Sequence, residues 1–449
     1  MKIELLGNNL TSWMIAAALA PCSQFQMSIL GEKTRHQYPP VQSVFPWFEQ
    51  YLELTKITPN IFTKQVSCQP LLAYQVFHSD KTHRFGFCDT GAPLGPADFI
   101  HLFSQLAGQN YPVGEFFDYS FAIQLAKQGK YIQPKKDAMS ILSTFEHGYI
   151  IDTDSFLTFL KNQLKAHYPG QIREIEEIQL NLSDKNGDVN QQADLQIDCR
   201  ERQSQYKHRT IQSVSWQCQL SEKPQLNFQK QVQLTQSGWL LALKPNTDSN
   251  TIHFQLNLTE SLELTQSQIQ TLVQQHSTDK NIQAVIPNSI QVQEIIEGPL
   301  IAFNQSAPAF NVHQTQANSW AMSSIDYTVL FIMALLDCIA LFKTPDLFQL
   351  AFNKCYQDKL TSVHRYQNML SDTLKGTTTN DSINLFLASG RIKQLDPDLI
   401  QPAWVAGLLM SLGYYPKSGN PFARQLPNAQ ISQHLQQIRQ VLQRTSQSI

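Results

Sequence analysis

The segment Leu6–Ala17 reads LGNNLTSWMIAA and joins two short apolar stretches, Lys2–Gly7 and Phe25–Leu30. The apolar stretches predict β-strands, and the Ala, Met and Ile side chains of Ser12–Ala20 predict a helix between them. A strand, a helix and a second strand at the beginning of a chain are typical of dinucleotide-binding folds. The turn after the first strand of such folds is rich in glycine, because backbone must approach a pyrophosphate closely there. The segment therefore predicts an α/β, Rossmann-like domain that begins at the N-terminus.

The rest of the chain changes from a β-rich middle to a helical end. A brief strand at Tyr149–Asp152 leads into an amphipathic helix, Ser155–His167, after which apolar and polar residues alternate. Lys185–Asp188 reads KNGD, which is a hairpin signal. Strands are expected at Gln171–Leu182, Ala193–Cys199, Ile211–Leu220, Leu226–Leu234, Trp239–Leu243, Ile252–Leu258 and Ile282–Val292. From Asp326 onward the pattern predicts mainly helices.

The overall composition excludes several classes of function. The formal net charge is −2, from 34 basic and 36 acidic residues, which gives no basic footprint for nucleic acid and no polybasic membrane patch. The seven cysteines are dispersed and never form a C-x-x-C pair, so we expect neither a metal site nor a disulfide framework. They favour a reducing, cytoplasmic location. The apolar run Thr328–Phe342 spans about 15 residues and contains Asp337, so it is expected to be a buried helix rather than a membrane span.

Four local matches carry a resemblance to a known family. Leu6–Ala17 is similar to a G-G-G-T-A-G-W-M-A-A motif, with Trp13 and Met14 matched, and Tyr149–Phe156 is similar to a strand-to-helix entry. Ala193–Cys199 reads ADLQIDC against A-D-L-F-I-D-C, and Gly238–Leu243 is similar to G-W-x-W-x-I-P. With these four segments in this order, the chain resembles the flavin-dependent tryptophan halogenases, a family of the flavoprotein monooxygenase class. The resemblance implies FAD as cofactor and an indole or tryptophan-like substrate.

The resemblance also implies a division of the chain into two parts. Residues 1–330 would form a discontinuous FAD-binding-like domain with an interleaved β-rich substrate region. Residues 331–449 would form a mostly helical C-terminal region.

The candidate cofactor-binding residues come from the first β-α-β unit. The three glycine positions of the turn are occupied by Gly7, Asn9 and Ser12, so the motif keeps only its first glycine. Asparagine tolerates a left-handed backbone, but its side chain would point to the place of a phosphate. Glu32 ends the second strand 25 residues after Gly7, where an acid that binds the adenosine ribose is expected. The full candidate set is Gly7, Asn9, Thr11, Ser12, Trp13 and Glu32, and it is compatible with a weakened FAD site or with an empty structural unit.

Other flavin-contacting segments of the family are replaced. The glycine-containing loop expected after the second strand reads RHQYPP at Arg35–Pro40, and the Ser-Gly pair expected after Cys199 is Arg200-Glu201. A Gly-Asp pair that meets the flavin in the family corresponds to Val312-His313. Of the Ser-Thr run that follows in the family, only two serines remain, Ser323 and Ser324.

The catalytic residues of the family have no clear match, so catalytic residues are left unknown. The essential lysine of the family would fall in Val66–Leu72, which contains none, and Lys64 could replace it only if the alignment slipped. The active-site Glu would fall near Ser319. Asp326 is expected to cap the buried helix instead, and Trp239 is expected to be a core aromatic.

These observations leave two main hypotheses and a third. The first is a pseudo-enzyme that binds FAD weakly or not at all and acts as a partner of another protein, for example of an active paralogue. The second is a divergent FAD-dependent halogenase or monooxygenase that acts on an indole or on a Trp-containing polypeptide. The third is a cleft that now binds a different small molecule.

Overall fold

The computed structural model describes residues 1–33, 39–78, 81–135, 140–175, 193–199, 212–219, 228–235, 238–244, 251–258, 300–302, 322–342, 344–374, 376, 381–393, 395–396, 399–417 and 420–449. These residues form two compact units. The first unit contains residues 1–69, 149–223 and 236–357, and the second contains residues 70–148, 224–235 and 358–449.

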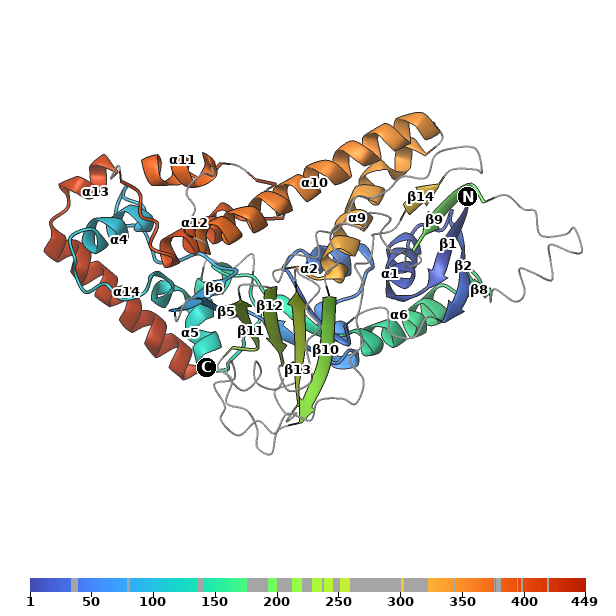
Figure 1. Ribbon diagram of the computed structural model, residues 1–449, viewed down its shortest axis with the longest axis horizontal. Helices are drawn as coiled ribbons and strands as arrows, with labels where there is room; N and C mark the ends of the chain where they lie inside the picture. The colour runs from blue at the N-terminus through green and yellow to red at the C-terminus, as the bar shows by residue number, and fades with distance from the viewer. Residues whose placement is uncertain are drawn as a thin grey trace, which may run out of the picture. The chain divides into compact units, whose positions relative to one another are not determined.

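The first unit is built on a sheet whose central strands are parallel. The strand order is β14-β9-β1-β2-β8, in which β1 pairs in parallel with β2 and β9, β2 pairs in parallel with β8, and β14 is antiparallel to β9. The strands are β1 (Lys2–Asn8), β2 (Gln26–Lys33), β8 (Ile172–Ile175), β9 (Leu195–Asp198) and β14 (Leu300–Ala302). Figure 1 shows this sheet with α1 (Leu10–Leu19) and α6 (Thr153–His167) beside it. The predicted α/β class and the predicted β-α-β beginning are therefore confirmed.

Helix α1 lies in the interior of this unit. All ten of its residues are buried, since it packs against both α6 and α9 (Ser324–Cys338). A helix that is apolar on every side needs neighbours on every side. The sequence of α1 is LTSWMIAAAL. Its small alanines permit the neighbouring elements to approach closely, and the side chains of Trp13 and Met14 fill the remaining volume.

A second part of the first unit has an aromatic core. A small sheet has the order β3-β7-β4, and it packs with two short helices. The elements are β3 (Val41–Val44), α2 (Phe48–Leu54), α3 (Pro59–Gln65), β4 (Cys68–Leu71) and β7 (Gly148–Asp152). The ring of Phe62 lies between 5.3 and 5.6 Å from the rings of Phe48, Tyr149 and Phe156. This unit also holds the antiparallel strands β10 (Gln212–Gln219), β13 (Thr251–Leu258) and β12 (Gly238–Leu243).

The second unit combines a hairpin with most of the C-terminal helices. Strands β5 (Ala73–His78) and β6 (Lys81–Gly86) are antiparallel, and β11 (Lys230–Thr235) pairs in parallel with β5. The helices are α4 (Phe99–Ala107), η1 (Phe116–Tyr119), α5 (Phe121–Lys127), α11 (Asp381–Ser389), α12 (Pro402–Ser411), α13 (Pro421–Gln425) and α14 (Asn428–Ser448). The 30-residue helix α10 (Pro345–Leu374) begins among the residues of the first unit and ends among those of the second.

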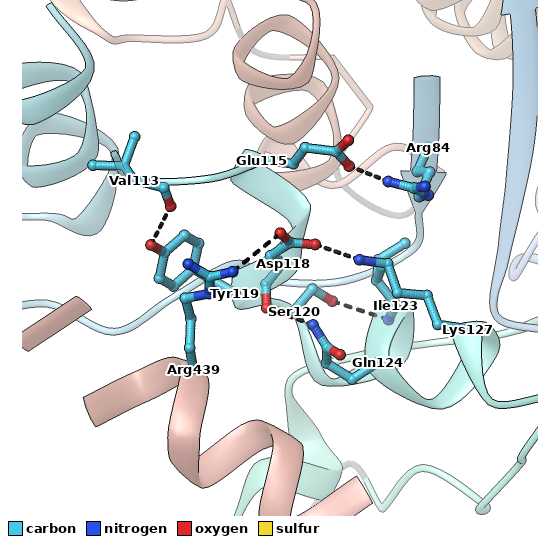
Figure 2. Close-up of polar contacts among 10 residues, drawn as sticks. All are labelled: Arg84, Val113, Glu115, Asp118, Tyr119, Ser120, Ile123, Gln124, Lys127 and Arg439. Atoms are coloured by element: carbon cyan, nitrogen blue, oxygen red, sulfur yellow. Dashed lines mark hydrogen bonds and ion pairs between the residues drawn. The ribbon is translucent and has the colours of Figure 1, made fainter. Parts of the chain in front are cut away.

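A charged network fixes α14 within the second unit. The carboxylate of Asp118 in η1 pairs with Lys127 of α5 and lies 3.6 Å from the guanidinium of Arg439 on α14 (Figure 2). Arg439 also lies over the ring of Tyr119, 5.7 Å from its centroid, and the Tyr119 hydroxyl donates to the Val113 carbonyl. One acid thus connects three elements, so this network is structural.

The structure contains elements that the sequence patterns did not place, namely β3, α2, α3, β4, β5 and β6. The predicted KNGD hairpin turn and the strand at 282–292 lie outside the described residues, and β8 and β9 are not neighbours but flank the β1–β2 pair. The division of the chain at residue 330 stays a prediction; residue 330 lies in α9, which packs on α1. The predicted buried helix begins earlier, at Ser324.

Helix α9 is long and apolar. With the following 3-10 turn it covers 18 residues, Ser324–Leu341, and in length and composition it is the one helix among the described residues that could cross a membrane. However, 67% of this window is buried inside the protein, as in the core helix of a folded domain.

Candidate functional site

The turn between β1 and α1 keeps one glycine whose backbone requires it. Gly7 has φ of 102° and Gly31 on β2 has φ of 125°, a region that favours glycine. A Cβ atom on Gly31 would lie 3.6 Å from the Cα and N atoms of Gly7, so the two strand ends are in contact. The pairing of β1 with β2 shifts register at this point, between Leu6 and Asn8. The first glycine of the motif therefore retains its conformational role.

Asn9 stands at the second glycine position and caps α1. Its φ and ψ are −131° and 177°, so its backbone is extended and the left-handed conformation considered from the sequence is not used. Its Oδ1 accepts the N–H of Ser12 at 3.1 Å, while the Asn9 N–H donates to Ser12 Oγ at 3.1 Å. Its Nδ2 donates to the carbonyl oxygen of Cys199 at 2.6 Å. Asn9 and Ser12 form a capping box that is linked to the end of β9.

Asn8 organises a second polar group around the same turn. Its Oδ1 accepts from Trp13 Nε1 at 2.8 Å and from Lys161 Nζ at 3.2 Å, and its Nδ2 is 3.4 Å from Glu174 Oε2. The Lys161 ammonium also lies 4.8 Å from the centroid of the Trp13 ring. Glu174 on β8 is 3.8 Å from Lys161 and 3.1 Å from Lys165.

The ion pairs decide the charge state of Glu174. Burial by itself would raise the pKa of this carboxyl group, but the hydrogen bond from Lys165 and the charges of Lys161 and Lys165 outweigh burial. The pKa of Glu174 is therefore lowered, and it is a carboxylate at neutral pH. The sequence alone did not single out Asn8, Lys161 or Glu174. Only the position of Asn8 inside the motif offered a signal.

The turn does not fit a pyrophosphate group as it is arranged. Asn8, Asn9, Thr11 and Ser12 have exposed fractions of 6%, 3%, 5% and 0%. A phosphate at a helix N-terminus binds to backbone N–H groups that the helix itself leaves unsatisfied. Here the Ser12 N–H is already satisfied by Asn9, and Thr11 Oγ1 lies 3.4 Å from Thr328 Oγ1 of α9. The candidate residues thus come together, but as a closed internal network.

One further candidate, Glu32, is described only in part. Glu32 lies in β2, directly after Gly31, and its side chain is outside the described residues. The replaced segments at 35–38, 200–201 and 312–313, and Ser319, also lie outside the described residues. Cys199 directly follows β9 and has a buried thiol, whose pKa is raised by burial and by the charge of Asp198.

The stretch where the resemblance places the catalytic lysine holds no lysine. Val66–Leu72 includes β4, and Leu71 and Leu72 are buried. Lys64 lies on the last turn of α3 with an exposed side chain, so it is not the desolvated amine that the family uses. Cys68 is no alternative nucleophile, because burial raises the pKa of its thiol to about 12.

The N-terminus of α9 is also closed by side chains. Asp326 is fully buried, and it accepts from the Ser323 N–H and from Ser323 Oγ, as the predicted cap. Its other oxygen accepts the N–H of Phe45 at 2.9 Å. Gln42 on β3 accepts from Ser324 Oγ at 2.9 Å. The two serines that match the family therefore serve the helix cap.

Trp239 and one unexpected lysine complete the comparison with the sequence. Trp239 on β12 is 5% exposed, in agreement with its prediction as a core aromatic. Lys230 on β11 is 1% exposed, with its ammonium 5.1 Å from the centroid of the Tyr74 ring. The alternation Leu226, Phe228, Lys230, Val232, Leu234 places Lys230 at an inward position, and this signal could have found it.

Comparison with known proteins identifies relatives of this chain. The family model described as "Tryptophan halogenase" matches residues 2–221. No curated protein matches. Among solved structures, the chain is similar to BrvH, a flavin-dependent halogenase from Brevundimonas sp. BAL3, with 14% identity, TM-score 0.74, and coverage of 99% of this chain and 96% of BrvH.

Two more solved structures have the same fold. SttH, a tryptophan 6-halogenase from Streptomyces toxytricini, has 10% identity, TM-score 0.72, and coverage of 100% of this chain and 97% of SttH. A tryptophan halogenase from Shewanella frigidimarina NCIMB 400 has 12% identity, TM-score 0.65, and coverage of 100% and 94%. At these identities the structures show that the fold is shared.

Proposed function

Because this chain belongs to the tryptophan halogenase family, we propose that it is a halogenase-like protein without halogenase activity, in which FAD binding is weak or lost. One observation carries the proposal. The segment Val66–Leu72, which should supply the reactive amine, contains no lysine, and the nearest lysine, Lys64, is exposed on α3.

The missing amine matters because of the chemistry that the resemblance implies. In the family a lysine holds or activates hypohalous acid at a distance from the flavin, and a desolvated amine suits this task. No residue of Val66–Leu72 carries an amine that could hold or direct such an oxidant. Cys68 lies within this segment, and its thiol remains protonated at neutral pH.

The state of the turn supports the second half of the proposal. A protein that depends on FAD needs backbone N–H groups that face the cofactor. The N–H groups of Asn9 and Ser12 are satisfied within the chain, and Asn8 engages Lys161, a cation beside the turn. This arrangement keeps the fold and reduces its need for a ligand.

We propose that the retained fold serves binding to another protein, for example to an active paralogue or to a polypeptide.

The cysteines of the described residues are free thiols, which supports a reducing compartment such as the cytoplasm. They are Cys22, Cys68, Cys88, Cys199, Cys338 and Cys355.

A second function is favoured by a specific observation. Gly7 and Gly31 keep the strand ends of a dinucleotide-binding fold in contact, and Glu32 follows on β2. This geometry supports a divergent FAD-dependent halogenase or monooxygenase that acts on an indole or a Trp-containing polypeptide.

A halogenation assay tests the proposed function. The purified protein would be incubated with FAD, a flavin reductase, NADH, bromide or chloride, and tryptophan or indole. We expect no halogenated product by mass spectrometry above the level given by reductase and free flavin alone. An active family member under the same conditions is the positive control. Product formation that depends on this chain would contradict the proposal and favour the divergent enzyme.

A further inference from the structure

We infer that the Asn9 side chain is an internal substitute for the phosphate ligand of this fold, so that it closes the turn and stabilises the protein without cofactor. The inference rests on the proposed loss of FAD binding and gives it a cause in one residue. Asn9 is 3% exposed, and its carboxamide bonds both the α1 N-terminus and the end of β9.

The acceptor half of the carboxamide replaces a phosphate oxygen. The first N–H groups of an α-helix have no partner within the helix, and a bound anion or a capping side chain can satisfy them. Asn9 Oδ1 accepts the Ser12 N–H at 3.1 Å, and Ser12 Oγ in turn accepts the Asn9 N–H at 3.1 Å. Glycines at these two positions would leave both N–H groups open to a ligand.

The donor half of the carboxamide does what a phosphate cannot. Asn9 Nδ2 donates to the Cys199 carbonyl oxygen at 2.6 Å and so links α1 to the carboxyl end of β9. A diphosphate near this point presents only acceptor oxygens, which would face the Cys199 carbonyl without a proton between them. The position therefore favours an amide over an anion, independently of its size.

The neighbouring residue reinforces this selectivity. Asn8 and Glu174 both engage Lys161, at 3.2 and 3.8 Å, so a cation beside the turn already has an anionic partner. A phosphate would have to compete with the Glu174 carboxylate for this charge.

The experiment compares FAD binding and thermal stability in four proteins. These are the wild type, Asn9→Gly combined with Ser12→Gly, Asn9→Asp, and Asn420→Gly. Asn9→Asp keeps the acceptor for the Ser12 N–H but removes the donor to Cys199. Asn420 is the matched control, because it caps α13 by accepting the Phe422 N–H and lies in the second unit.

We expect the double glycine variant to lose roughly 2–4 °C in Tm without FAD and to regain a similar amount at a tenfold excess of FAD over its Kd. Asn9→Asp should lose stability and show no FAD-dependent shift. The wild type and Asn420→Gly should show no FAD-dependent shift. FAD binding would be followed by flavin fluorescence anisotropy and by Tm.

The outcomes separate the inference from the proposed function. A folded double variant with unchanged Tm and no FAD binding would overturn the inference and leave the proposed function standing. Saturable binding of FAD to the wild type, with Kd near micromolar, would overturn both. If the double variant does not fold, amide exchange in the wild type decides. The Ser12 N–H should exchange as slowly as the α1 interior with or without FAD, and exchange at the rate of an open loop would overturn the inference.

Discussion

Asp326→Ala is expected to lower the free energy of unfolding of the first unit by about 3–5 kcal/mol. The carboxylate is fully buried and accepts from the N–H of Phe45 and from the N–H and hydroxyl of Ser323. Alanine would leave these donors without that acceptor in the interior, and each unsatisfied donor costs about 1–3 kcal/mol. Urea denaturation followed by tryptophan fluorescence would measure the change.

Asp154→Ala is the matched control for this substitution. Asp154 also lies in the first turn of a helix, α6, but its side chain is exposed. We expect a loss of no more than about 0.5–1 kcal/mol. Similar losses in the free energy of unfolding for the two variants would mean that the buried cap of α9 stabilises the protein no more than an exposed acid at a helix start.

Phe62→Ala is expected to cost about 3–5 kcal/mol through loss of packing. The side chain of Phe62 is fully buried, with its ring near those of Phe48, Tyr149, Phe156 and Phe159. Alanine would remove most of the ring volume from a cluster that joins α2, α3, β7 and α6. The same denaturation experiment would report the change.

Phe422→Ala provides the comparison, because Phe422 is 52% exposed. Its replacement should change the free energy of unfolding by less than about 0.5 kcal/mol. A loss below about 1 kcal/mol for Phe62→Ala would contradict the packing described for the first unit.

Much of the fold could be predicted because its signals are local. The period of the apolar residues placed β1, α1, β2, α6 and most of the described strands, and Asp326 indicated the cap of α9. Trp239 could be assigned to the core because it lies in an apolar strand. The ends of α9 and the allocation of this helix to the first unit depend on its packing against α1, which no local pattern contains.

The candidate site was less predictable because its contacts join distant parts of the sequence. Asn9 meets Cys199 190 residues away, and Asn8 meets Glu174 166 residues away. The sequence indicated that asparagine obstructs a phosphate, but not that its amide bonds to two backbone groups at once. In the sequence, Lys161 is an ordinary polar residue of an amphipathic helix. Its contacts with the turn arise only because α6 packs against α1.

Helices α1 and α9 of the first unit share one feature. The N-terminus of α1 is capped by Asn9 and Ser12, and that of α9 by Ser323 and Asp326. We propose that this double closure lets the halogenase fold persist without its cofactor. A fold that satisfies its own helix ends does not need a bound anion to remain stable.

The most direct test of this account is the visible absorption spectrum of the freshly purified protein, followed by titration with FAD. The account predicts no bound flavin after purification and no saturable uptake during the titration. A bound flavin spectrum, or stoichiometric binding with a Kd near or below micromolar, would contradict it.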